Sequence, residues 1–130
     1  MPWLIFFVTS TLAADLNRIK VGEKDNREVF LYVDNNKPEI KDGIVTTWSI
    51  ANVITPESKD QDAYASIRVL QQYNCTERLS RMLAFVSYSQ KDGDGTVVST
   101  GASDNLPFTE VGGDSINERI LNRVCPHPGP

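Results

Sequence analysis

The sequence has few of the side chains on which most catalytic and metal sites depend. Its 130 residues include one histidine, His127, and two cysteines, Cys75 and Cys125. A catalytic triad needs an oriented base beside its nucleophile, and His127 stands in a terminal stretch of proline and glycine. Two cysteines and one histidine are also too few ligands for a closed zinc site. We therefore expect neither an enzyme nor a protein with a metal or other cofactor.

An excess of positive charge is also missing. The chain has 13 Lys and Arg against 17 Asp and Glu, which gives a formal net charge of −4. Nucleic-acid binding needs a basic patch that neutralises phosphates, and docking on anionic lipid has a similar requirement. The composition therefore excludes both as expected partners.

The N-terminus has the pattern of an export signal. The apolar run Trp3–Val8 is followed by mostly small residues up to Ala14, and the first charged residue is Asp15. Such a run is too short to span a bilayer and is typical of a signal peptide. We expect residues 1–14 to be cleaved, which leaves no membrane span. The alternative is a buried N-terminal strand.

The two cysteines are expected to form a disulfide. An exported chain with an even cysteine count normally oxidises them. Cys75 follows a strand-like segment and Cys125 ends an amphipathic helix, so the bond would tie a sheet to a helix. The alternative is two free thiols in a cytosolic protein.

Most of the chain alternates apolar and polar residues with the period of a β-strand. The predicted strands are Asn17–Gly22, Val29–Val33, Ile44–Val53, Ala63–Asn74, Arg78–Ser89, Thr96–Thr100 and a short Phe108–Val111. Within Arg78–Ser89, we expect Leu79, Leu83 and Phe85 on one face and Met82, Ala84, Val86 and Tyr88 on the other. A helix over Thr76–Ala84 is the alternative.

Three polar segments predict turns between these strands. Asp34–Pro38 is a polar turn cluster, and Asp42-Gly43 is a dipeptide favoured in tight hairpins. Gln90–Gly95 is a strong turn signal. Its Asp92–Thr96 part faintly resembles a calcium loop, but it lacks the third carboxylate and the distal glutamate, so a hairpin turn is expected.

The C-terminal region predicts one helix. Ser115 and Glu118 have the spacing of a capping box, and Pro126 ends the helix. Ile116, Ile120, Leu121 and Val124 form an apolar stripe at helical spacing. The pieces predict an α+β fold, an antiparallel β-sheet with the C-terminal α-helix packed on one face and tied by one disulfide. We expect residues 15–125 to form a single domain and residues 126–130 to form a disordered tail.

Two further patterns have structural alternatives. Arg68, Arg78 and Arg81 could form a basic ligand-binding patch, or they could lie on an ordinary solvated sheet face. Asn74-Cys75-Thr76 matches an N-glycosylation sequon, and the match is only formal if the source is bacterial.

The order of several short motifs resembles the surface-adhesin protein E family of Gram-negative bacteria. The motifs are Leu31-Tyr32-Val33-Asp34, Val45-Thr46-Thr47-Trp48, Ser66-Ile67-Arg68, Tyr73-Asn74-Cys75, Tyr88-Ser89, Asp94-Gly95-Thr96-Val97-Val98, Phe108-Thr109-Glu110-Val111 and Val124-Cys125. The likeness spans roughly residues 16–125. It implies an exported antiparallel β domain whose C-terminal helix is stapled by one disulfide.

The resemblance also implies a function. It indicates a non-enzymatic surface protein that binds host extracellular-matrix or serum proteins. The alternative is a periplasmic inhibitor or accessory subunit of another envelope protein. In either case we expect a protein partner, and location in the periplasm or on the surface of a Gram-negative cell. Unpaired sheet edges would also allow a homodimer.

Overall fold

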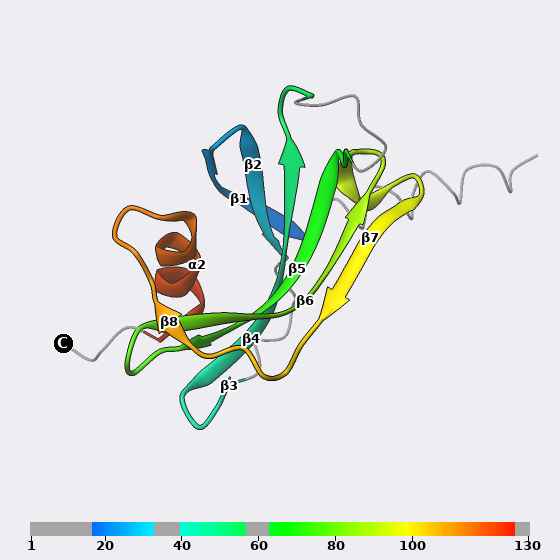
Figure 1. Cartoon of the computed structure of the whole chain (residues 1–130). Helices are drawn as coiled ribbons and strands as arrows, with labels where there is room; N and C mark the ends of the chain where they lie inside the picture. Colours follow the sequence, from blue (N-terminus) through cyan, green and yellow to red (C-terminus); the bar gives the residue numbers. More distant parts are fainter. Residues whose placement is uncertain (1–16, 33–39, 57–62, 127–130) are drawn as a thin grey trace, which may run out of the picture.

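The chain folds into one antiparallel sheet in which spatial order follows chain order (Figure 1). The computed structural model describes residues 17–32, 40–56 and 63–126. The main strands are β1 (Arg18–Lys24), β2 (Arg27–Tyr32), β4 (Ile44–Val53), β5 (Ser66–Asn74), β6 (Leu79–Tyr88) and β7 (Val97–Ala102), side by side in that order. Two short strands, β3 (Ile40–Lys41) and β8 (Thr109–Glu110), pair with the first residues of β4 and β6.

Several sequence-based expectations concern other parts of the chain. The signal peptide over residues 1–14, the turn over residues 34–38 and the tail after residue 126 lie outside the described residues. Each strand predicted within the described residues is present. The segment Arg78–Ser89 is a strand rather than a helix.

The predicted tight hairpin at Asp42-Gly43 is confirmed. Both residues have positive φ, 56° and 78°, and they connect β3 to β4. Asp25 and Asn26 adopt the same left-handed region between β1 and β2, with φ of 53° and 64°. Two successive left-handed residues match the twist of a two-residue hairpin, and Asp, Asn and Gly adopt that region most readily.

The C-terminal helix, α2 (Ile116–Val124), begins and ends where its sequence predicts. The Ser115 hydroxyl accepts a hydrogen bond from the Glu118 backbone N–H at 3.1 Å. The Glu118 carboxylate reaches back to the Asp114 N–H at 3.3 Å, one residue earlier than in a standard capping box.

The core lies between α2 and one face of the sheet, which we call the helix face. Val29, Leu31, Val45 and Tyr73 of the sheet meet Ile120, Leu121 and Val124 of the helix, all at most 9% exposed. A disulfide joins Cys75, just after β5, to Cys125 at the helix end, with 5.5 Å between the Cα atoms. The predicted α+β fold and its disulfide tie are thus confirmed.

Tyr73 joins sheet and helix by a polar contact as well. Its fully buried side chain places the hydroxyl 2.7 Å from Gln71 Oε1 and 2.9 Å from Asn117 Oδ1 on α2. Burial raises the pKa of Tyr73, so the phenol keeps the proton that it donates to one of these oxygens.

A β-bulge in β6 changes which of its side chains share a face, so the faces differ from those predicted. Leu70 pairs with Ala84, but the next residue, Gln71, pairs with Met82, so Leu83 is an extra residue in β6. Met82 therefore shares the helix face with Phe85, and Leu79 lies on the opposite face. The expectation that Leu79 and Phe85 share a face was wrong, because a bulge reverses the alternation at one point.

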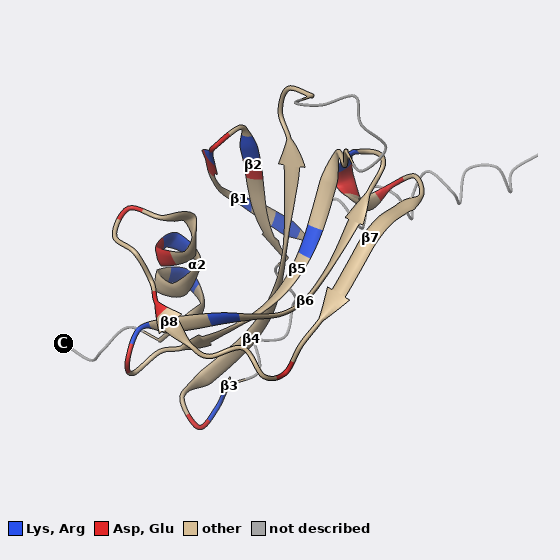
Figure 2. Ribbon diagram, viewed as in Figure 1, with Lys and Arg blue, Asp and Glu red and all other residues tan. Residues whose placement is uncertain are grey.

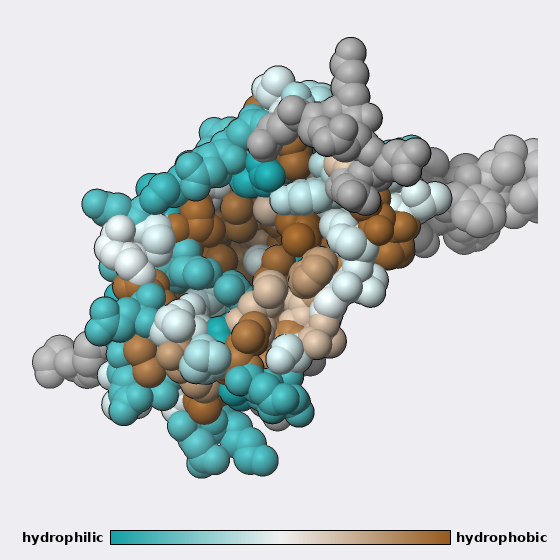
Figure 3. Space-filling view, in the orientation of Figure 1, coloured by the Kyte–Doolittle hydropathy of each residue, from teal (hydrophilic) through white to brown (hydrophobic). Residues whose placement is uncertain are grey.

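The helix covers only part of its face of the sheet. It packs mainly against β1, where Gly22 allows close approach: a Cβ on Gly22 would lie 3.0 Å from Ile116 Cδ1 and collide with the Arg119 side chain. Beyond the helix, Ile67, Val69, Met82 and Phe85 are only partly buried. Figure 3 shows a hollow lined with hydrophobic residues beside α2.

Candidate functional site

The side of the sheet opposite α2 carries a surface of arginines and aromatic rings, which we call the arginine face. Its members are Arg18, Phe30, Tyr32, Trp48, Ile50, Arg68, Leu70, Arg81, Val86 and Phe108. Strand register assembles it, because Phe30, Ile50, Arg68 and Val86 are direct neighbours across β2, β4, β5 and β6. Trp48 and Leu70 form the next row.

Each arginine of this face lies over an aromatic ring. The guanidinium carbon of Arg18 is 4.2 Å from the centre of the Phe30 ring, and that of Arg81 is 4.6 Å from the Phe108 ring. Arg68 lies 5.2 Å from the rings of both Tyr32 and Trp48. These distances are within the range of cation–π attraction.

The three arginines differ in their hydrogen bonds. Arg18 pairs with the Asp92 carboxylate at 2.7 Å. Arg81 donates to Gln72 Oε1 at 2.9 Å and to the Leu106 carbonyl at 3.3 Å. Arg68 has no acceptor among the described residues, and its Nε is buried without a partner.

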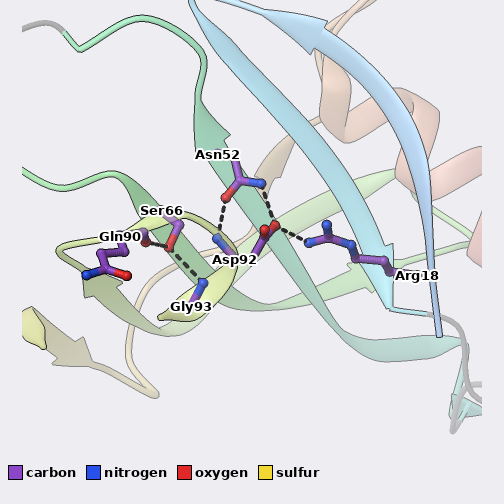
Figure 4. A network of polar contacts seen from close by, with 6 residues as sticks. All are labelled: Arg18, Asn52, Ser66, Gln90, Asp92 and Gly93. Carbon is purple, nitrogen blue, oxygen red and sulfur yellow. Dashed lines mark hydrogen bonds and ion pairs between the residues drawn. The ribbon is translucent and has the colours of Figure 1, made fainter. Parts of the chain in front are cut away.

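A turn is fastened over one end of the arginine face (Figure 4). Asn52 on β4 donates to Asp92 Oδ1 and accepts from the Asp92 backbone N–H, both at 2.8 Å. Ser66 on β5 accepts from the Gly93 N–H at 2.9 Å and donates to the Gln90 carbonyl at 2.6 Å. These bonds hold the short helical turn η2 (Lys91–Gly93) against the sheet.

Asp92 also links this turn to β1. Partial burial raises the pKa of its carboxyl group, but hydrogen bonds from Asn52 and Arg18 and the charge of Arg18 lower it by more, so the net shift is downward. Asp92 is therefore ionised at neutral pH and neutralises Arg18. Its positive φ of 62° lies in the left-handed region that aspartate tolerates.

We expect Asn52→Ala to lower the free energy of unfolding by about 2 kcal/mol, because two partly buried hydrogen bonds are lost. Urea unfolding followed by circular dichroism measures this. Asn105→Ala, at an exposed loop position, is the control and should change stability by less than about 0.5 kcal/mol. Equal effects of the two variants would contradict the role given to Asn52.

The three arginines considered as one basic patch do not come together. Arg78 lies in the turn between β5 and β6, where its NH2 group donates to Asn122 Oδ1 of α2 at 3.0 Å. Arg68 and Arg81 lie on the opposite side of the sheet. Figure 2 likewise shows basic segments on β1, β5 and β6 scattered rather than clustered.

The Asp92–Thr96 segment forms the expected turn. The Ser89 backbone N–H donates to the Thr96 carbonyl at 2.9 Å, just before β7 begins. The described residues contain no group of three His, Cys, Asp or Glu side chains suited to a metal ion. Cys75 and Cys125 are bonded to each other, on the helix side of the sheet.

The sequence did not reveal the arginine face as a site. Alternation along single strands places Trp48 with Ile50 and Phe30 with Tyr32, but it does not show which strands are neighbours or in what register. The nearest signal was the possible basic patch of Arg68, Arg78 and Arg81, of which Arg68 and Arg81 lie on this face.

Comparison with known proteins agrees with this architecture. The sequence model of the family described as Surface-adhesin protein E matches residues 19–126. No curated protein sequence matches the chain. Within the described residues, no helix is long and apolar enough to cross a membrane.

Crystal structures of Haemophilus influenzae protein E have a similar fold. Crystal form II is 15% identical with a TM-score of 0.56, and the match covers 84% of this chain and 87% of that one. The protein E structure from the non-typeable bacterium is 16% identical with a TM-score of 0.52, covering 84% and 75%. At such low identity the structures show a shared fold, whereas the sequence model spans most of the chain. This protein belongs to the surface-adhesin protein E family.

Proposed function

We propose that this protein is an exported, non-enzymatic binding protein that attaches to host extracellular-matrix or serum proteins. The family match over residues 19–126 is the observation that carries the proposal. Membership of a surface-adhesin family supports binding at the cell surface rather than catalysis. We further infer that residues 1–14 are removed on export and that residues 15–125 function as one domain, with residues 126–130 as a tail.

The arginine face offers the side chains that such binding uses. Arginine, tryptophan and tyrosine are the residues most enriched at energetic hot spots of protein interfaces. Here Trp48, Tyr32 and Arg68 lie together on the middle strands, next to the fully buried Ile50. An open sheet surface suits a folded or extended polypeptide better than a small substrate that needs a deep pocket.

The test is a binding and localisation experiment on the native protein. We expect antibodies to label intact cells, and we expect immobilised protein to retain matrix or serum proteins from extracts. Confinement to the periplasm with retention of an envelope protein would instead support an inhibitor or accessory subunit. Retention of no matrix or serum protein would refute the host-binding proposal and leave the fold unaffected.

The binding face can be located with matched variants. We expect Trp48→Ala to weaken retention of the partner at least about tenfold, since truncation of a central interface tryptophan typically costs more than 1.4 kcal/mol. Met82→Ala changes a partly buried apolar residue on the helix face and should leave retention unchanged. The reverse result would assign binding to the hollow beside α2. Circular dichroism verifies that both variants fold.

A further inference from the structure

Arg68 is the group on the arginine face whose hydrogen-bonding capacity is unused. A guanidinium carries five N–H donors, and no described residue accepts from that of Arg68. Its Nε is buried without a partner, whereas its two terminal nitrogens keep contact with solvent. Arg18 and Arg81, on the same face, have oxygen acceptors at 2.7 to 3.3 Å. The terminal N–H groups, which also lack acceptors in the described part of the chain, are the donors that an acceptor from outside can reach.

The guanidinium of Arg68 is already oriented. The rings of Tyr32 and Trp48 lie at equal distances of 5.2 Å. The turn held by Asn52 and Ser66 covers the stem of the side chain, because a Cβ on Gly93 would lie 3.8 Å from Arg68 Cδ. A group held in place before its ligand arrives loses little entropy on binding.

We propose that Arg68 binds the carboxylate of an acidic side chain on a partner polypeptide. The planar guanidinium matches a carboxylate through two parallel N–H···O bonds. Val86 on β6 pairs with Arg68 and Leu70 lies two residues along β5, both only partly buried, so apolar residues beside the acidic one would meet apolar surface. This inference rests on the proposed function, since it specifies the chemistry of the protein partner.

The charges of the arginine face favour one carboxylate over a polyanion. Asp92 neutralises Arg18, and the whole chain has a formal net charge of −4. Sulfated glycans and nucleic acids need several cations together, because their binding depends on neutralising many charges. Arg68, whose N–H donors lack acceptors among the described residues, lies amid aromatic and aliphatic side chains, which instead suits one acidic residue in a short peptide segment.

The test uses hydrocinnamate, a carboxylate with an apolar body, on the full domain. Titration is followed by proton–nitrogen correlation NMR, which reports the Trp48 indole N–H and the Arg68 Nε–H. We expect both signals to shift, with affinity at least about tenfold above that of the uncharged hydrocinnamide, because charge-assisted hydrogen bonds are the stronger kind. Equal binding of the amide, or no shift with hydrocinnamate, would overturn the proposal. Tighter binding of inorganic sulfate would overturn the choice of a carboxylate.

Two arginine variants provide the matched control. Arg68→Met should weaken hydrocinnamate binding at least about tenfold, whereas Arg78→Met should change it less than about twofold, since Arg78 lies on the helix side of the sheet. Arg68→Lys keeps the charge without the planar fork and should also lose about tenfold. Wild-type affinity in Arg68→Lys or Arg68→Met would refute the paired hydrogen bonds.

Stability distinguishes binding from a structural role. Arg68→Met removes an unpaired buried N–H, so we expect it to unfold at the same urea concentration as the wild type or at a higher one. Marked destabilisation would show that Arg68 serves the fold and would contradict the proposal. The probe experiment is independent of host proteins: carboxylate binding without retention of a matrix protein would refute only the proposed function, and the opposite pair of results would refute only this inference.

Discussion

Reduction of the Cys75–Cys125 disulfide is expected to lower the free energy of unfolding by about 4 kcal/mol, on the chain-entropy estimate for a closed loop of this length. The two cysteines are 50 positions apart, so the bond removes much freedom from the unfolded chain. A domain of this size has roughly 5 to 15 kcal/mol of stability in total. Urea unfolding followed by circular dichroism, with and without dithiothreitol, measures the loss.

A double variant isolates the contribution of the bond. The protein with Cys75→Ser and Cys125→Ser should unfold at the same urea concentration as the reduced wild type, and reductant should have no effect on it. The same unfolding midpoint for oxidised and reduced wild type would show that the disulfide does not stabilise the fold.

Leu121→Ala is expected to lower the free energy of unfolding by about 3 kcal/mol. Leu121 is fully buried between α2 and the sheet, and truncation of a buried leucine leaves a cavity that costs about 2 to 5 kcal/mol. Urea unfolding at fixed disulfide state measures this effect. The matched control is Arg123→Ala, an exposed position two residues along the same helix, which should change stability by less than about 0.5 kcal/mol.

One outcome would contradict the packing role of Leu121. If α2 were held to the sheet by the disulfide alone, Leu121→Ala would have as little effect as Arg123→Ala in the oxidised protein. A large effect of Leu121→Ala in both redox states would instead show that apolar packing and the disulfide both hold the helix.

Local signals explain why much of the fold was predictable. The Ser115 and Glu118 cap and the stripe of Ile120, Leu121 and Val124 lie within a few residues of one another, so α2 could be placed to the residue. Asp42-Gly43 likewise encodes its hairpin in two adjacent residues with positive φ. The disulfide was predictable for a different reason, because a chain with two cysteines allows only one pairing.

The bulge in β6 was not predictable, because strand alternation in the sequence contains no mark of an extra residue. Leu83 lies between two well-formed halves of β6, and only pairing with β5 reveals the shift. As a result, Met82 lies on the helix face together with Phe85, and not on the opposite face.

By itself, the sequence determined the secondary structure, the single disulfide and the side chains that a strand without a bulge offers to either face, since these depend on neighbours along the chain. Only the tertiary structure decided which side chains meet across strands. It placed Arg68 between Tyr32 and Trp48, paired Arg18 with Asp92, and set Arg78 apart on the helix side. Register and twist bring together residues far apart in the chain, and these contacts make the arginine face a candidate for binding.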